Sequence, residues 1–243
     1  MSVYVITHKN YKKPNIECYK TLLVGAYKGH ILGEDVLNDD VGENISEKNA
    51  NYCELTGLYW IWKNINSEDY VGLVHYRRYF CKRNIFKSTL LEEKRISKIL
   101  KKYDLILPKK LNIVPNVYSQ YEREHFKNDL DLCLDIINRD YPEFSKSVKT
   151  VMNADKASLF NMFIMSKKDM DNYCEWLFDI LFKLEKQIDV SNRDEYQKRV
   201  FGFISERLFN IWLNHNNFKI YYTSVYDQNV CPLKLKIKRI FKV

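Results

Sequence analysis

Apolar side chains recur at helical spacing in the first strongly patterned part of the chain, residues 44–64. One face of the expected helix carries Tyr52, Leu55, Tyr59 and Trp62. Asn44, with Glu47 three residues later, has the spacing of a capping box, which marks where such a helix begins. After four polar residues the period changes, and residues 70–74 (YVGLV) predict a buried strand of the kind found in parallel sheets.

Similar runs elsewhere predict strands that alternate with helices. Strands are expected at residues 3–6, 22–26, 103–107 and 160–165, and helices at residues 90–102, 117–138 and 193–215, the last broken near Gly202. A further helix should follow Ser166, capped by Ser166 and Asp169, with a core face of Met170, Tyr173, Cys174, Leu177, Ile180, Leu181 and Leu184. This alternation predicts an α/β fold with a mostly parallel central sheet flanked by helices.

The strand at residues 70–74 runs directly into His75, Tyr76, Arg77 and Arg78. Ligands of open α/β sheets bind beyond the carboxyl ends of the strands. Alternation would put His75 and Arg77 on one face and the other two residues on the opposite face. Because a guanidinium offers a bidentate fork that matches phosphate oxygens, this strand end predicts an anion site. The alternative is that these cations pair with nearby carboxylates or lie in water.

Long stretches of the chain are similar to one known family. Residues 42–64 (GENISEKNANYCELTGLYWIWKN) and 69–80 (DYVGLVHYRRYF) resemble a bacterial family from capsule and O-antigen gene clusters. The resemblance continues through residues 120–131, 160–178 and 198–213, so it spans nearly the whole chain. That family, formerly described as a domain of unknown function, is understood as β-galactofuranosyltransferases with a GT-A-like fold.

The resemblance implies a single GT-A-like domain over residues 1–243. Its expected activity is inverting transfer of galactofuranose from UDP-galactofuranose to a glycan acceptor in capsular polysaccharide or O-antigen synthesis. A UDP-pyranose transferase of the same pathway and a non-catalytic glycan-binding module are the alternatives. The sequence alone does not fix the acceptor sugar, the linkage position or the oligomeric state.

The loop after the first strand contains Thr7, His8 and Lys9. In GT-A-like folds this loop holds the nucleotide, so the resemblance implies contacts to uridine or phosphate; the alternative is an ordinary basic loop. Many GT-A enzymes also hold a divalent metal with an Asp-x-Asp at the end of a core strand, where this chain has His75-Tyr76-Arg77-Arg78. Cations there would repel a metal and neutralise diphosphate themselves. We therefore expect a metal-independent enzyme with no cofactor.

Further donor and acceptor residues are assigned in the segments that carry the resemblance. We add Asn44 and Lys48 to the donor site, and assign Gln120, Tyr121 and Asn161 to the acceptor. Asn161 is a polar residue at the start of an expected buried strand, and in GT-A-like enzymes this strand borders the acceptor.

Inversion requires a base beside the acceptor hydroxyl. Glu206 is the first candidate, because it is expected to open a helix after Gly202, as an acidic residue does in many inverting GT-A enzymes; the helix macrodipole would equally favour an acidic residue there. His125 and Asp129 are four residues apart in an expected helix, and so would share a face. Asp129 acting with His125, and Glu124, are the competing candidates, although such a pair can also be a surface ion pair.

The net charge of the chain indicates which class of molecule the protein binds. The 243 residues carry a net charge of +8 with a pI near 9.0, which predicts an anionic partner: nucleotide phosphates, lipid headgroups or nucleic acid. The chain resembles no zinc finger, RNA-recognition motif or basic zipper, so we do not expect a nucleic acid.

The six cysteines are scattered without CxxC pairs, and the opening residues MSVYVITHK do not resemble a signal peptide. We therefore expect reduced thiols in a cytoplasmic protein. No apolar run approaches the length of a membrane span. The basic tail from about residue 232 alternates cations with aliphatic residues, and it could contact the inner face of the membrane, where a lipid-linked glycan acceptor would lie. A solvated tail or a last strand on the sheet is the alternative.

Overall fold

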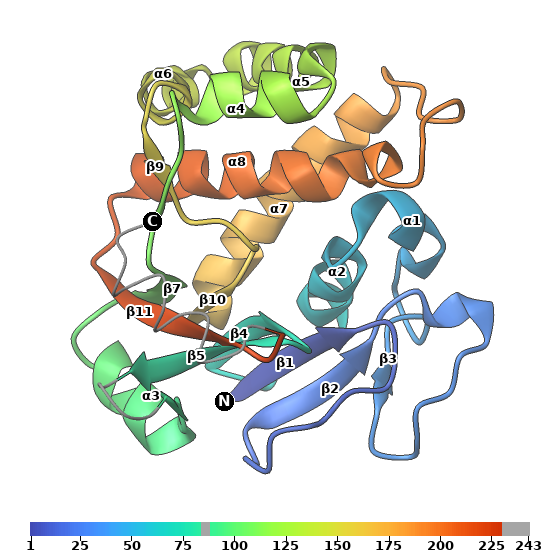
Figure 1. The fold of residues 1–243 in the computed structure, drawn as a ribbon, viewed down its shortest axis with the longest axis vertical. Helices are drawn as coiled ribbons and strands as arrows, with labels where there is room; N and C mark the ends of the chain where they lie inside the picture. Colours follow the sequence, from blue (N-terminus) through green and yellow to red (C-terminus); the bar gives the residue numbers. More distant parts are fainter. Residues whose placement is uncertain (84–87, 230–243) are drawn as a thin grey trace.

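The computed structural model describes residues 1–83 and 88–229, and a nine-stranded sheet runs through this part of the chain (Figure 1). The strand order is β3-β2-β1-β4-β10-β7-β11-β5-β6. The strands are β1 (Ser2–Thr7), β2 (Tyr19–Leu23), β3 (Leu37–Asn38), β4 (Tyr70–His75), β5 (Arg78–Arg83), β6 (Ser88–Leu90), β7 (Leu105–Pro108), β10 (Phe163–Ser166) and β11 (Ile220–Asp227). Two short strands, β8 (Leu111–Asn112) and β9 (Lys156–Ala157), form a separate ribbon.

The prediction of a mostly parallel sheet is right for the first half only. Strands β3, β2, β1 and β4 are parallel, whereas β10 lies antiparallel to both of its neighbours, β4 and β7. In the second half β7 and β11 are parallel, but β5 is antiparallel to β11 and β6. A parallel neighbour requires a long crossover connection. Strand β4 instead turns back at once through Tyr76 and Arg77 into β5.

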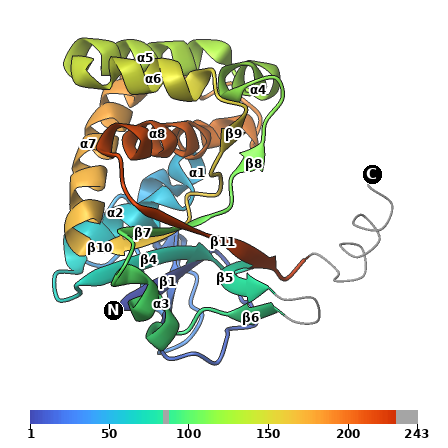
Figure 2. The same ribbon diagram turned by 90° about the vertical axis from the view of Figure 1, so that its left-hand side faces the viewer.

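Helices cover both faces of the sheet. They are α1 (Asn49–Tyr52), α2 (Leu55–Asn64), α3 (Glu93–Leu100), α4 (Val117–Glu124), α5 (Lys127–Asp140), α6 (Ser145–Met152), α7 (Lys167–Glu185) and α8 (Val200–Asn216). Figure 2 shows α3 on one side of the sheet and α2, α7 and α8 on the other. Helices α5 and α6 pack on α7 and α8 and form an outer layer with α4. The sheet and α8 therefore both lie inside the molecule.

Alternation along β1 divides its side chains between two hydrophobic cores. Tyr4 and Ile6 belong to the larger core, which contains the buried faces of α2, α7 and α8. Val3 and Val5 point to the smaller core with Ile96 of α3. Burial on both faces explains the continuous apolar run that predicts this strand.

Helix α2 approaches the sheet closely at Gly57. A Cβ built there would lie 2.7 Å from the Cδ1 atom of Ile6 and 2.9 Å from the Cγ1 atom of Val24. Glycine weakens a helix by about 1 kcal/mol relative to alanine. Here it allows α2 to lie directly on β1, and this places the start of α2 beside the end of that strand.

The helix after Ser166 is confirmed. The Ser166 hydroxyl accepts a hydrogen bond from the Asp169 backbone N–H at 3.0 Å, and α7 begins at Lys167. Every residue of its predicted core face is buried.

Three other helix predictions need correction. The helix expected at residues 44–64 is divided by Cys53, whose φ of 53° lies in the left-handed region, into α1 and α2. The helix expected at residues 117–138 is interrupted at His125 and Phe126, both of which have extended backbone. No break occurs at Gly202, since α8 runs from Val200 to Asn216 and Gly202 packs on Cys53.

The capping box predicted for Asn44 and Glu47 does not form. The Asn44 side chain instead accepts from the Ser46 N–H at 3.1 Å and closes the loop before α1. That loop is anchored on the buried Asp39 carboxylate, which accepts hydrogen bonds from the Ser46 and Thr56 hydroxyls and from the N–H groups of residues 25 and 26. Asp39 thus joins the end of β2 to α2.

Within residues 1–83 and 88–229, no helix is long and apolar enough to cross a membrane. The five cysteines of these ranges are free thiols: Cys18, Cys53, Cys81, Cys133 and Cys174. The basic tail from about residue 232, which is predicted to contact a membrane, lies outside the described residues.

Candidate active site

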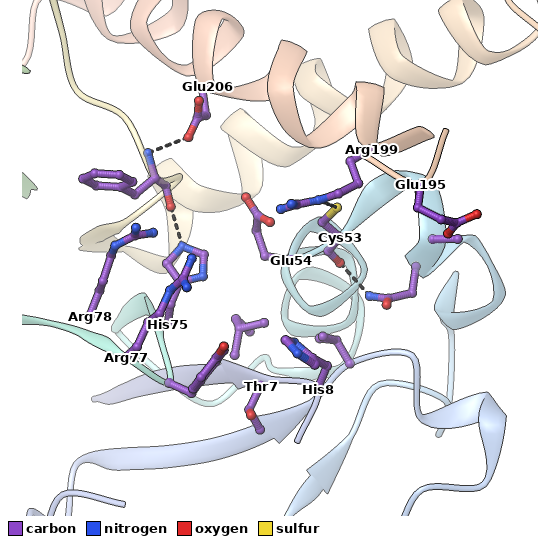
Figure 3. Close-up of a pocket in the computed structure, with 16 residues that line it drawn as sticks. Thr7, His8, Cys53, Glu54, His75, Arg77, Arg78, Glu195, Arg199 and Glu206 are labelled. Atoms are coloured by element: carbon purple, nitrogen blue, oxygen red, sulfur yellow. Dashed lines mark hydrogen bonds between the residues drawn. The ribbon is translucent and has the colours of Figure 1, made fainter. Parts of the chain in front are cut away.

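A cleft of about 520 Å³ lies beyond the carboxyl ends of β1 and β4. These parallel strands are neighbours, with Ile6 opposite His75, so the residues that follow each of them meet at one edge of the sheet. The break between α1 and α2 and the first turns of α8 complete the walls (Figure 3). The lining residues are Ile6, Thr7, His8, Val24, Asn49, Ala50, Cys53, Glu54, His75, Tyr76, Arg77, Arg78, Phe160, Glu195, Arg199 and Glu206.

Two guanidiniums of the cleft have no carboxylate within 4.0 Å among the described residues: Arg77 and Arg199. Arg77 lies in the tight turn between β4 and β5, and Arg199 directly precedes α8. The Arg199 Nε–H donates to the Cys53 Sγ atom at 3.2 Å, a weak acceptor, and the Glu54 carboxylate acts on the Arg199 charge only from beyond ion-pair distance. The two side chains enter the cleft from different walls (Figure 3).

Arg78 is held more firmly. Its Nε atom lies 3.1 Å from an Asp227 carboxylate oxygen, and its guanidinium lies over the Phe160 ring at 4.2 Å. Much of its charge is therefore compensated by the protein. Of the two adjacent arginines that the sequence singles out, Arg77 is the one whose charge is available to a ligand.

The sequence predicts that His75 shares a face of the strand with Arg77 and adds a second positive charge, and neither expectation agrees with the structure. The strand ends at His75, which pairs across the hairpin with Arg78, so His75 and Arg78 are side by side. The His75 Nε2 atom lies 2.5 Å from the Phe160 carbonyl oxygen, so this nitrogen carries the proton and donates it. Burial lowers the pKa of His75, Glu54 and the Phe160 carbonyl oppose this, and Arg78 and Arg77 add to the lowering, so the neutral ring is favoured.

His8 lies beside this hairpin, in an edge-to-face contact with the Tyr76 ring at 5.4 Å between centroids. Partial burial lowers the pKa of His8, and the charges of Lys9, Arg199 and Arg77 lower it further. Thr7 lines the cleft too, and its hydroxyl donates to the Lys9 carbonyl oxygen at 2.5 Å. Both histidines therefore offer hydrogen bonds to a ligand and no positive charge.

Glu206 lines the cleft, but it does not open a helix. It lies in the second turn of α8 because the helix continues through Gly202. One carboxylate oxygen accepts from the Phe160 backbone N–H at 2.8 Å, and the other lies 3.0 Å from Nη1 of Arg207. Burial raises the pKa of Glu206, and Arg207 and the Phe160 N–H oppose this rise.

Glu54 is a second carboxylate of the cleft, and no sequence pattern singled it out. It follows Cys53 at the break between α1 and α2, and Figure 3 shows it between His75 and Arg199. One of its oxygens accepts from the Asn161 side-chain amide at 2.7 Å. Glu195, a third carboxylate, lies at the far side, is 89% exposed and pairs with Lys198.

The turn before β10 connects these groups. The strand expected at 160–165 begins only at Phe163, and Phe160 and Asn161 have φ angles of 83° and 48°, which non-glycine residues rarely adopt. Asn161 is 5% exposed and donates to Glu54 and to the Ser205 hydroxyl, so it supports the cleft from behind. It does not line the cleft, as an acceptor-binding residue would.

The other acceptor residues from the sequence are also behind the wall. Tyr121 is fully buried beneath the guanidinium of Arg207, and Gln120 accepts a hydrogen bond from Arg207 at 2.5 Å. They contact the residue that pairs with Glu206, one layer away from the cleft.

His125 and Asp129 do not form the predicted pair. Because the helix is interrupted between them, His125 stacks on the Phe203 ring at 4.0 Å, and its Nδ1 atom lies 3.3 Å from Gln197. The Asp129 carboxylate is buried and held by both terminal nitrogens of Arg193, at 2.5 and 2.8 Å. Neither residue lines the cleft, so the premise for a catalytic pair is wrong.

Three predicted donor residues lie outside the cleft lining. Lys48 is paired with Glu185 at 2.7 Å, and Asn44 closes its own loop. Lys9 lies near the Tyr76 ring, at 5.3 Å from its centroid. By contrast, Thr7, His8 and residues 75–78 all line the cleft, as their position at the ends of neighbouring strands predicts. Glu206 of α8 lines the same cleft.

Among the described residues, no group of three or more histidine, cysteine, aspartate or glutamate side chains is arranged to hold a metal ion. The polar groups that converge in the cleft are two guanidiniums that have no ion-pair partner among the described residues, two neutral imidazoles and the carboxylates of Glu54 and Glu206. This set can neutralise an anion and accept a proton.

A family profile described as "Domain of unknown function (DUF4422)" matches residues 2–217. The chain belongs to this family. The DUF4422 match runs from β1 to the end of α8 and includes every residue that lines the cleft. A comparison with curated protein sequences gives no match.

Among solved structures, this DUF4422 chain is similar to the apo structure of the WbbM bifunctional glycosyltransferase. The TM-score is 0.87 at 33% sequence identity, over 94% of this chain and 45% of the WbbM chain. The chain thus spans less than half of the length of WbbM.

Proposed function

We propose that this protein is a glycosyltransferase with a GT-A-like fold, and that it moves galactofuranose from UDP-galactofuranose to a glycan acceptor with inversion. The observation that carries the proposal is a pair of guanidiniums that have no ion-pair partner among the described residues, Arg77 and Arg199, in a cleft at the carboxyl ends of two parallel strands. The likeness to a bifunctional glycosyltransferase supports the reaction class. The family resemblance read from the sequence supports the choice of donor.

In this reaction an oxygen of the acceptor attacks the anomeric carbon of the sugar, and the bond from that carbon to the diphosphate breaks. The diphosphate leaves with the electron pair and gains negative charge. Fixed positive groups stabilise such a charge best where they need not reorganise. Arg77 and Arg199 supply that charge, Arg78 adds a partly compensated one, and His8 offers a hydrogen bond.

The transfer is proposed to need no metal ion. A divalent metal would meet Arg77, Arg78 and Arg199 around the cleft, and like charges repel it. The same arginines neutralise the diphosphate that a metal would otherwise bind. Activity that is lost in EDTA and restored by manganese would contradict this part of the proposal.

The acceptor is proposed to be a lipid-linked glycan of capsular polysaccharide or O-antigen synthesis, met at the cytoplasmic face of the membrane. Inversion also needs a carboxylate beside the acceptor hydroxyl, and Glu54, Glu195 and Glu206 are the carboxylates among the lining residues. A pyranose donor of the same pathway is the second candidate, because the charges of the cleft recognise the diphosphate and not the ring of the sugar.

The test is donor binding followed by donor choice. A ligand at one hundred times its Kd stabilises the folded state by about 2.7 kcal/mol, so saturating UDP should raise the melting temperature by several degrees. Hydrolysis and transfer are then compared for UDP-galactofuranose and UDP-galactopyranose. A chain that ignores UDP but binds glycans would be a glycan-binding module, and faster turnover of the pyranose donor would change the assigned sugar.

A further inference from the structure

We propose that Glu54 is the carboxylate that receives the acceptor proton, and that Glu206 is a positioning residue. This inference rests on the proposed function, since it assigns roles within the same transfer reaction. It differs from the expectation based on sequence, in which Glu206 was the first candidate.

Glu206 is the ion-pair partner of a buried arginine. Arg207 is 3% exposed, and its Nε atom is buried without a hydrogen-bond partner. Glu206 is the carboxylate that pairs with it, and an uncompensated buried charge is strongly destabilising. A base becomes neutral in every turnover. Protonation of Glu206 would leave the Arg207 charge buried without its counter-ion, and this cost opposes the rise in the pKa of Glu206 that burial causes.

The two carboxylates also differ in the hydrogen bonds that they accept. Both oxygens of Glu206 are engaged, one by the Phe160 N–H and one by Arg207. Glu54 accepts one described hydrogen bond, from Asn161 to Oε1, and its other oxygen has no described partner. A protonated Glu54 could still accept that bond through its carbonyl oxygen. Glu54 forms no ion pair within 4.0 Å among the described residues, so its protonation breaks none, although its charge acts on Arg199 and Glu206.

Two residues with strained backbone hold Glu54 in the cleft. Cys53, directly before it, has φ 53° and ψ −126°, and Asn161, which holds its carboxylate, has φ 48°. Such angles cost on the order of 1–3 kcal/mol each in a non-glycine residue and persist only where the surroundings enforce them. Both strained residues act on Glu54. The Phe160–Asn161 turn is in turn held by Glu206, which is what makes Glu206 a positioning residue.

The step is a single displacement. The acceptor O–H bond breaks as its oxygen bonds to the anomeric carbon, and the proton passes to the free oxygen of Glu54. The bond between the anomeric carbon and the diphosphate breaks, and the departing electron pair stays on the diphosphate between Arg77 and Arg199. Glu54 lies between His75 and Arg199 in the cleft (Figure 3), and it later returns the proton to water.

The experiment compares Glu54→Gln with Glu206→Gln, and uses the exposed Glu122→Gln as a matched control away from the cleft. Glutamine keeps an oxygen for the Asn161 amide, so Glu54→Gln should fold and bind UDP within about twofold of the wild type. General-base catalysis contributes about 10²–10⁴-fold, so its turnover should fall by that factor. Glu206→Gln should lower the melting temperature, because Arg207 loses its counter-ion, and should lower turnover less than tenfold.

Chemical rescue separates a base from a structural residue. Formate, a small carboxylate, should restore part of the transfer in Glu54→Ala and none in Glu206→Ala. Glu54→Asp provides a second variant that keeps the charge, and it should retain the acidic limb of the pH–rate profile that Glu54→Gln loses. Near-normal turnover of Glu54→Gln, or formate rescue confined to Glu206→Ala, would overturn the assignment. A wild-type protein that neither binds UDP nor transfers sugar would overturn the proposed function, and this inference with it.

Discussion

Replacing Arg77 by alanine tests the charge that the donor site depends on. Within the described residues Arg77 has no carboxylate partner, so its removal strands no protein charge, and the change acts on the ligand alone. A hydrogen bond to a charged group contributes about 1.5–3 kcal/mol. Since about 1.4 kcal/mol corresponds to a factor of ten, Arg77→Ala should raise the Kd for UDP by about tenfold to 150-fold.

The assay is titration calorimetry with UDP at about 50 mM and about 300 mM salt, since screening lengths fall from roughly 14 Å to 6 Å over this range. Arg95→Ala, on the exposed face of α3, removes the same charge far from the cleft and serves as the control. A Kd for Arg77→Ala within twofold of the wild type would refute the reasoning. An equal loss in Arg95→Ala would show that net charge, not the cleft, attracts the nucleotide.

Three further changes follow from the structure. His75→Gln keeps an N–H for the Phe160 carbonyl but cannot titrate. Because burial lowers the pKa of His75, the folded state binds fewer protons than the unfolded state, and the stability of the wild type should fall as the pH drops below about 6.5. Over the same pH range the melting temperature of the variant should fall less. Asp129→Asn leaves the largely buried Arg193 without its counter-ion and should lower the free energy of unfolding by about 3–5 kcal/mol, with UDP affinity unchanged if the two are only a structural pair. Gly57→Ala should destabilise by about 1–3 kcal/mol in urea unfolding, because the added methyl group meets Ile6; no change would mean that α2 can move away from β1.

The parts of the fold that were predictable have local causes. Strands β1 and β4 are buried on both faces, which leaves a continuous apolar run, and α7 has both a cap and an unbroken core face. The helix breaks at Cys53 and His125 have no such signal, since no glycine or proline marks them. Gly202, which looked like a break, is instead a small residue where α8 packs on Cys53. Tertiary packing decided all three cases.

The candidate site was predictable where polar residues end core strands. Thr7, His8 and residues 75–78 stand out for that reason, and the sheet brings them together. Glu54 and Arg199 were missed because each lies in a segment whose pattern is that of a helix, where a charged residue is normally a solvated one. The positive φ at Cys53 directs Glu54 toward the cleft, and the packing of α8 brings Arg199 to it. Both depend on contacts between distant parts of the chain.

The distance in sequence between the walls of the cleft has a consequence for folding. His8, Glu54, Arg77, Phe160 and Arg199 come from five separate segments, so the cleft exists only after α8 has docked on the sheet. Contacts of such long range form slowly, because the chain loses conformational entropy on closing the loop before the contacts can stabilise the closed state. Docking of α8 also brings Arg199 to the cleft that holds Arg77 and Arg78, and these like charges repel one another when the cleft is empty. A nucleotide diphosphate removes that repulsion, so the donor should accelerate the completion of folding as well as stabilise its product.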